Sequence, residues 1–108
     1  MKILAHRGYW KKKSEQNTLK ALIEGLIIGD GIEFDIRDYS NKIVISHDIS
    51  YSYSLFLEEL FVEYKKNGLH DKYLAINIKS DGLKKKLGQL IKKLKIWRVL
   101  LQSLVKVE

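Results

Sequence analysis

The chain has 108 residues, which is enough for one domain and too few for two. Hydrophobic residues make up 45% of the sequence and charged residues 31%, so the composition is that of a globular chain and not of a disordered one. The sequence has no cysteine, which excludes disulfides and thiolate metal sites, and no apolar run approaches the roughly 20 residues of a membrane span. The apolar start at residues 2–5 is too short for a secretory signal, so we expect a cytoplasmic protein.

The net charge of +7 comes largely from clustered lysines. Such a surface favours anionic partners: phosphate groups, anionic lipid head groups or nucleic acid. No aromatic residues interleave the clusters as a single-strand-binding groove requires, so a solvated surface is favoured over a specific nucleic-acid site. The clusters lie at residues 11–13, 65–66, 84–86 and 92–93.

The first part of the chain has a strand pattern followed by a helix pattern. The apolar run at residues 2–5 predicts a buried strand that ends at His6-Arg7-Gly8. Asn17-Thr18 then offers an N-cap for a helix over residues 19–27, whose apolar residues recur at spacings of three and four. Glycines at 29 and 31 end this helix.

Residues 31–37 alternate as a strand, with Glu33 and Asp35 on the same face. A polar turn follows, and a second apolar run at residues 43–45 leads into Ser46-His47-Asp48, which indicates a hairpin. Two carboxylates at this spacing suit a hard cation such as Mg²⁺ or Ca²⁺, with the histidine placed to transfer a proton. The alternative is a solvated strand face whose carboxylates pair with lysines.

The second half of the chain continues the alternation. Ser54 is the expected N-cap of a second helix, which Asn67-Gly68 closes. Trp97 stands at the start of the last apolar run, so we expect it in the core. The predicted elements are a helix over residues 55–66, a strand over 73–79, a helix over 83–94 and a strand over 96–101.

This order of elements indicates parallel strands joined by crossover helices. The active site of such a sheet lies at the carboxyl ends of its strands. Polar side chains occupy those ends in this sequence, which favours a functional site over a solvated surface. They are His6, Arg7, Glu33, Asp35, His47 and Lys79.

Five short motifs occur in order at these strand ends and helix starts, namely HRG at 6–8, QNT at 16–18, GIEFD at 31–35, VISHD at 44–48 and INIK at 76–79. Together they resemble the glycerophosphodiester phosphodiesterase family and its relatives among the phosphatidylinositol-specific phospholipase C-like barrels. The resemblance implies an α/β fold, a partial (β/α)8 TIM-type barrel of about four parallel strands and three helices with a β-hairpin after the second strand. It also implies metal-dependent hydrolysis of phosphodiesters in lipid or glycerophosphodiester metabolism.

The resemblance also implies a role for each matching residue. A divalent metal, Mg²⁺ or Ca²⁺, would provide charge neutralisation at the phosphate, and two histidines would transfer protons. By position, the metal ligands would be Glu33, Asp35 and Asn77, the general base and acid would be His6 and His47, and the phosphate-binding residues would be Arg7 and Lys79.

The sequence departs from the family in charge and in size. The family has glutamate at the positions of Gln16 and Asn77, so we expect weaker metal binding here. A full barrel takes about 250 residues, so residues 1–108 correspond to one domain that is an N-terminal half-barrel. We expect the missing half of the barrel to be explained by truncation, or to be supplied by a second copy of the chain or by a complementary half-barrel. The alternative function is that of a noncatalytic remnant or a phosphate-binding or assembly module.

Overall fold

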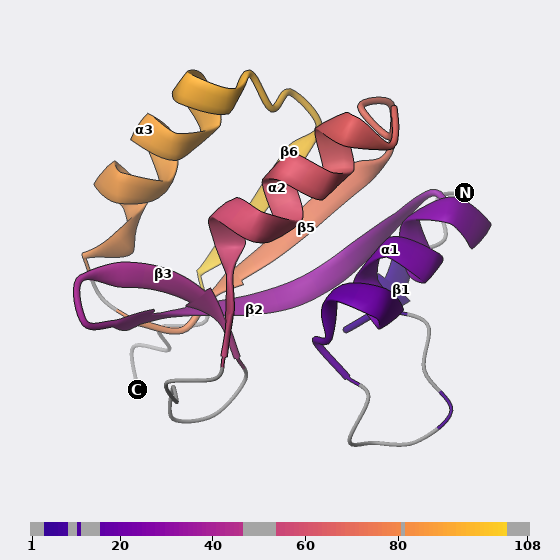
Figure 1. The fold of residues 1–108 in the computed structure, drawn as a ribbon. Helices are drawn as coiled ribbons and strands as arrows, with labels where there is room; N and C mark the ends of the chain where they lie inside the picture. The colour runs from indigo at the N-terminus through magenta and orange to yellow at the C-terminus, as the bar shows by residue number, and fades with distance from the viewer. Residues whose placement is uncertain (1–3, 9–10, 12–15, 47–53, 81, 104–108) are drawn as a thin grey trace.

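The structure is a computed structural model that describes residues 4–8, 11, 16–46, 54–80 and 82–103. One β-sheet and three helices make up this part of the chain (Figure 1). The strands are β1 (Leu4–His6), β2 (Gly31–Tyr39), β3 (Lys42–Ile45), β4 (Leu55–Phe56), β5 (Tyr73–Ile78) and β6 (Val99–Ser103), and the helices are α1 (Leu19–Ile28), α2 (Leu57–Lys66) and α3 (Leu83–Leu94).

The sheet has mixed strand directions around the long strand β2. Strands β1, β2, β5 and β6 are parallel neighbours in that order, as the alternating pattern predicted. Strand β3 folds back antiparallel to β2 and pairs in turn with β4. Strands β1 and β3 share one edge of β2, β1 along its first three residues and β3 along its last four. A TIM-type barrel stays a prediction, because β6 pairs only with β5 among the residues the structure describes.

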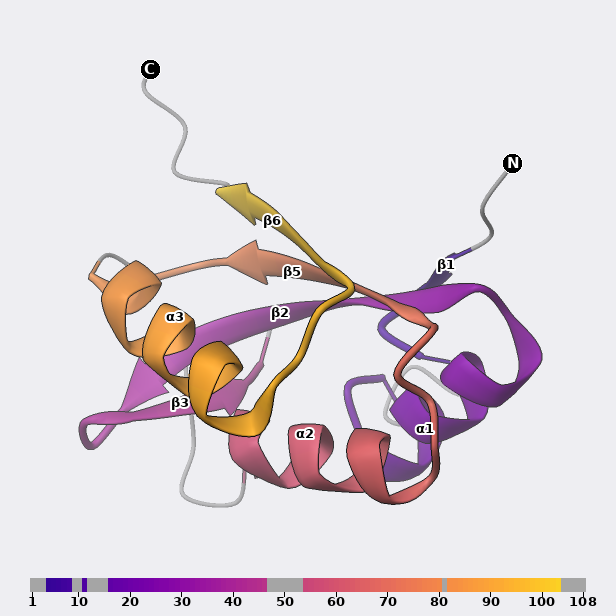
Figure 2. The ribbon, with the colours of Figure 1, turned by 90° about the horizontal axis from the view of Figure 1, so that it is seen from above.

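All three helices lie on one side of the sheet, as the view from above shows (Figure 2). The core fills the layer between them. Ile32, Phe34 and Ile36 of β2 are fully buried there, because alternate residues of a strand point to the same face. The carboxylates of Glu33 and Asp35 therefore project from the opposite face, which no helix of the described residues covers.

The helix starts confirm one predicted cap and correct another. The Oγ1 of Thr18 accepts a hydrogen bond from the backbone N–H of Ala21, at 3.2 Å, as expected of an N-cap. The prediction that Ser54 caps the second helix was wrong. Leu55 and Phe56 instead pair with β3, so α2 begins two residues later, and the Phe56 N–H donates to the Glu59 carboxylate at 2.9 Å.

The last apolar run is less buried than its composition predicted. Trp97 is 72% exposed and precedes β6, so the expectation of a core tryptophan was wrong. Leu100 and Leu101, on opposite faces of β6, are also exposed. The physical reason is that β6 is an edge strand here, with no further strand paired along its outer side in the described part of the chain. Ile27 and Ile28 of α1, a helix that packs against β1 and β2, are exposed as well.

None of the described helices is long and apolar enough to cross a membrane.

Candidate functional site

The parallel register brings the predicted polar residues into two adjacent rows. His6 of β1 is level with Glu33 of β2, and Asp35 is level with Asn77 of β5. Side chains level with each other on neighbouring strands share a face, so these four residues lie on the face away from the helices. Lys79 follows directly after β5, and its N–H donates to the carbonyl oxygen of Ile36 at 2.9 Å.

Asp35 is the centre of the site. Its side chain is almost fully buried, and both carboxylate oxygens have nitrogen partners. The Nε of Arg7 donates to Oδ2 at 3.0 Å, while the Nζ of Lys79 is 3.8 Å from Oδ1. The side-chain amide of Asn77 donates to the same Oδ1 at 3.3 Å. A buried carboxylate needs such partners because water no longer solvates its charge.

A tight turn after β1 aims Arg7 at this carboxylate. Arg7 and Gly8 both have positive φ angles, 56° and 89°, so the chain reverses sharply after His6. A Cβ on Gly8 would lie 2.5 Å from the main chain of Ala21, so only glycine allows α1 to pack this closely. The backbone N–H of Asn17 donates to the carbonyl oxygen of Arg7 at 3.0 Å, which ties the turn to the start of α1.

Gln16 also belongs to the site, through a contact with Arg7 that the sequence did not predict. Its Oε1 accepts a hydrogen bond from the Nη1 of Arg7 at 3.3 Å. The QNT motif marks this position, where the resemblance implies glutamate. A neutral amide in this place holds the guanidinium by hydrogen bonding without adding negative charge.

His6 and Glu33 form an outer pair that solvent reaches. The Nε2 of His6 lies 3.6 Å from the Oε1 of Glu33, and the two side chains are 58% and 31% exposed. The carboxylate is therefore close enough to orient the imidazole. A histidine held in this way can accept and return a proton at the surface of the site.

His47 lies outside the described residues. The residue before it, Ser46, donates its backbone N–H to the carbonyl oxygen of Asp35 at 2.9 Å, so the chain passes beside the main chain of Asp35 at that point.

The Oδ1 of Asn77 is a buried oxygen with no hydrogen-bond partner in the described structure, a property it shares with the Oδ1 of Asn17. An unpartnered buried acceptor beside a carboxylate fits a cation or a donor supplied by a ligand. Glu33, Asp35 and Asn77 together offer the oxygen donors that Mg²⁺ and Ca²⁺ prefer, so they fit a hard cation in donor type. Within the described residues no group of three or more His, Cys, Asp or Glu side chains is arranged to hold a metal.

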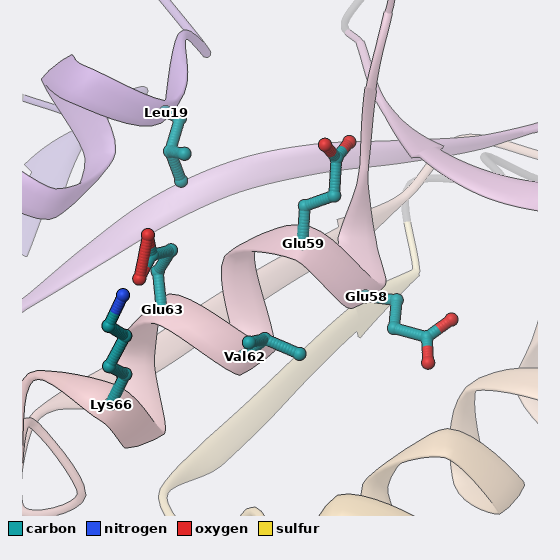
Figure 3. Close-up of a pocket in the computed structure, with 6 residues that line it drawn as sticks. All are labelled: Leu19, Glu58, Glu59, Val62, Glu63 and Lys66. Atoms are coloured by element: carbon teal, nitrogen blue, oxygen red, sulfur yellow. The ribbon is translucent and has the colours of Figure 1, made fainter.

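A cavity of about 430 Å³ lies elsewhere, on the helix side of the molecule (Figure 3). It runs along α2 and includes none of the residues around Asp35. Its walls are acidic, and Figure 3 shows the carboxylates of α2 spread along the helix without converging on a single point. The lining residues are Leu19, Glu58, Glu59, Val62, Glu63 and Lys66.

Comparison with known proteins gives a result for the fold and none for the sequence. No protein-family model matches the chain, and no curated protein matches it. The fold is similar to that in the crystal structure of "a putative glycerophosphodiester phosphodiesterase from Galdieria sulphuraria", with a TM-score of 0.76 and 23% sequence identity. The likeness establishes the fold. It covers 94% of this chain and 56% of that one, so the chain spans little more than half of the neighbour's length.

Proposed function

We propose that this chain belongs to a metal-dependent phosphodiester hydrolase of the glycerophosphodiester phosphodiesterase type. The observation that carries the proposal is the convergence of Arg7 and Lys79 on Asp35, with His6 and Glu33 beside them on the same sheet face. The fold likeness supports the reaction class, because the neighbour's description names the same activity.

The positive side chains would bind the phosphate. A phosphodiester carries one negative charge, and Arg7 presents a planar guanidinium that matches two phosphate oxygens. Lys79 adds a second charge from the end of β5, on the other side of β2 from Arg7. Both side chains are held by Asp35, so they are positioned before the substrate arrives, which lowers the entropy cost of binding.

Proton transfer would fall to the two histidines. His6, next to the Glu33 carboxylate, would take the proton from the attacking oxygen, and His47 would protonate the leaving alkoxide. Glu33, Asp35 and Asn77 would hold the Mg²⁺ or Ca²⁺ ion. When bound, that ion would stabilise the negative charge that builds up on the phosphoryl oxygens.

Hydrolysis of a chromogenic phosphodiester, with and without added Mg²⁺ or Ca²⁺, tests the proposal. We expect metal-dependent turnover that falls at least about 100-fold in His6→Ala, the loss typical for a general acid–base residue. Glu33→Ala should fall similarly. His70→Ala is the matched control, because His70 is exposed and lies in the turn before β5. Turnover that survives in His6→Ala, or that falls equally in His70→Ala, would contradict these roles.

A noncatalytic phosphate-binding or assembly module is the second candidate. The observation in its favour is that the buried residues around Asp35 include two cations and only one carboxylate. Such a module would bind a phosphodiester without cleaving it. Binding in the folded protein with no turnover above that of His6→Ala would select this reading.

We also propose that a second copy of the chain or a complementary half-barrel covers the open sheet edges. The exposed apolar residues support this. Trp97, Leu100 and Leu101 lie in or just before the edge strand β6, and Ile27 and Ile28 lie on α1, the helix that packs against β1 and β2. Unpaired edge strands of this kind readily add another strand. Light scattering on the purified chain tests the first partner. A dimer would support a second copy, and a stable monomer would rule it out.

A further inference from the structure

We propose that the divalent cation and the phosphate group enter this site together, each raising the affinity of the site for the other. The inference rests on the proposed function, since it concerns the metal and the anion which that function needs. It follows from the way Arg7 and Lys79 already occupy the oxygens of Asp35.

The three charged residues in contact at the centre of the site, Arg7, Asp35 and Lys79, have an excess of positive charge, while the more exposed Glu33 carboxylate beside them faces His6. Arg7 and Lys79 contribute two positive charges and Asp35 one negative charge, so their formal sum is +1. The side chains of Arg7 and Lys79 are 15% and 16% exposed, so water screens them only partly. Neither neighbouring amide, Gln16 on Arg7 nor Asn77 on Asp35, adds negative charge.

A divalent cation by itself meets two obstacles here. Oδ2 of Asp35 accepts a hydrogen bond from Arg7, and Oδ1 accepts one from Asn77 and lies 3.8 Å from the Nζ of Lys79, so a cation would have to compete with donors at both oxygens. The cation would also have to approach two positive side chains at short range. We therefore expect metal alone to bind weakly.

A phosphate group removes both obstacles. Its oxygens attract Arg7 and Lys79, which releases the Asp35 oxygens for the cation, and its negative charge offsets the added positive charge. The buried Oδ1 of Asn77, which has no partner in the described structure, then has a cation to contact. Because linkage is reciprocal, the cation must raise phosphate affinity by the same factor.

Asn77 sets the strength of this coupling. It stands level with Asp35 on the neighbouring strand and donates to its Oδ1. A carboxylate at this position would bring the formal charge of the group around Asp35, including Arg7 and Lys79, to zero. The Asn77→Asp variant should therefore bind the cation without help from phosphate. Lys79→Gln removes one of the two cations, so it should bind metal alone more tightly and phosphate less tightly than the wild type.

Isothermal titration of Mg²⁺ into the protein, with and without dimethyl phosphate, measures the coupling. Dimethyl phosphate is a stable phosphodiester, so binding is read without turnover and separately from the hydrolysis assay. We expect Mg²⁺ to bind wild type about tenfold more tightly when dimethyl phosphate is present, a size common for coupled ligands. Titrating dimethyl phosphate with and without Mg²⁺ should return the same factor.

The variants give the decisive comparison. Asn77→Asp should bind Mg²⁺ alone about tenfold more tightly than wild type and lose most of the dependence on dimethyl phosphate. Asn67→Asp makes the same charge change at the exposed C-cap of α2 and should behave as wild type. The proposal fails if wild-type Mg²⁺ affinity is the same with and without dimethyl phosphate, or if Asn67→Asp raises it as much as Asn77→Asp does. Mg²⁺ binding that is coupled to dimethyl phosphate, in a chain without hydrolysis, would uphold this inference and overturn the catalytic proposal.

Discussion

Replacing Arg7 by methionine tests whether the Asp35 pair holds the site together. Methionine keeps most of the apolar length of arginine but removes the charge and the hydrogen bond to Oδ2, which is 3.0 Å long. Breaking a buried ion pair by removing one partner typically costs about 3–5 kcal/mol. Here Asn77 and Lys79 still contact the other oxygen, so the carboxylate is not left alone. We therefore expect a loss of about 2 kcal/mol, near the value for a single hydrogen bond to a charged group.

Urea unfolding followed by circular dichroism measures this change, with the midpoint expected to fall and the slope to stay constant. Arg98→Met is the matched control, because Arg98 is exposed and its guanidinium contacts the Tyr73 side chain and no carboxylate of the described residues. It should change stability by less than about 1 kcal/mol. Asp35→Asn combined with Arg7→Met should cost less than the sum of the two single changes. A loss below about 0.5 kcal/mol for Arg7→Met, or strict additivity, would refute the reasoning.

Three further changes test the fold by denaturant unfolding. Gly8→Ala should lower the free energy of unfolding by more than about 2 kcal/mol, because the added Cβ would collide with the main chain of α1. Gly68→Ala is the control: Gly68 also has a positive φ but has open space around it, so the loss should be only about 1 kcal/mol. Equal losses in the two variants would contradict this. Burial, and to a lesser degree the Asp71 charge, raise the pKa of Tyr64 from 10.0 to about 12. The neutral phenol therefore contributes stability that is fully present below pH 10 and is lost as the pH rises through 12. Tyr64→Phe should lose less stability than wild type between these pH values. If the stability of the two proteins falls equally over this range, the reasoning is refuted. Trp97→Ala should cost less than about 1 kcal/mol in the monomer, because the side chain is largely exposed; a loss near 3 kcal/mol would place it in a core.

The periodicity of the sequence was sufficient to predict most of the elements. The alternation of Ile32, Phe34 and Ile36 with charged residues determined which face of β2 is buried, because a strand repeats every two residues. The helix predicted over residues 83–94 has those bounds in the structure. The sequence also predicted that His6 and Glu33 lie close together, and the two residues are level in the register of β1 and β2, although Glu33 lies near the start of β2 and not at its carboxyl end.

The contacts of the site were decided by the tertiary structure. Arg7 and Asp35 are 28 residues apart in the chain, and Asn77 is 42 residues beyond Asp35, so no local pattern specifies which oxygen each one contacts. The pairing of β4 with β3 and the exposure of Trp97 were missed for the same reason. Local sequence determines period and polarity, whereas burial and charge pairing depend on which strand comes next in the sheet. That neighbour exists only once the chain has folded.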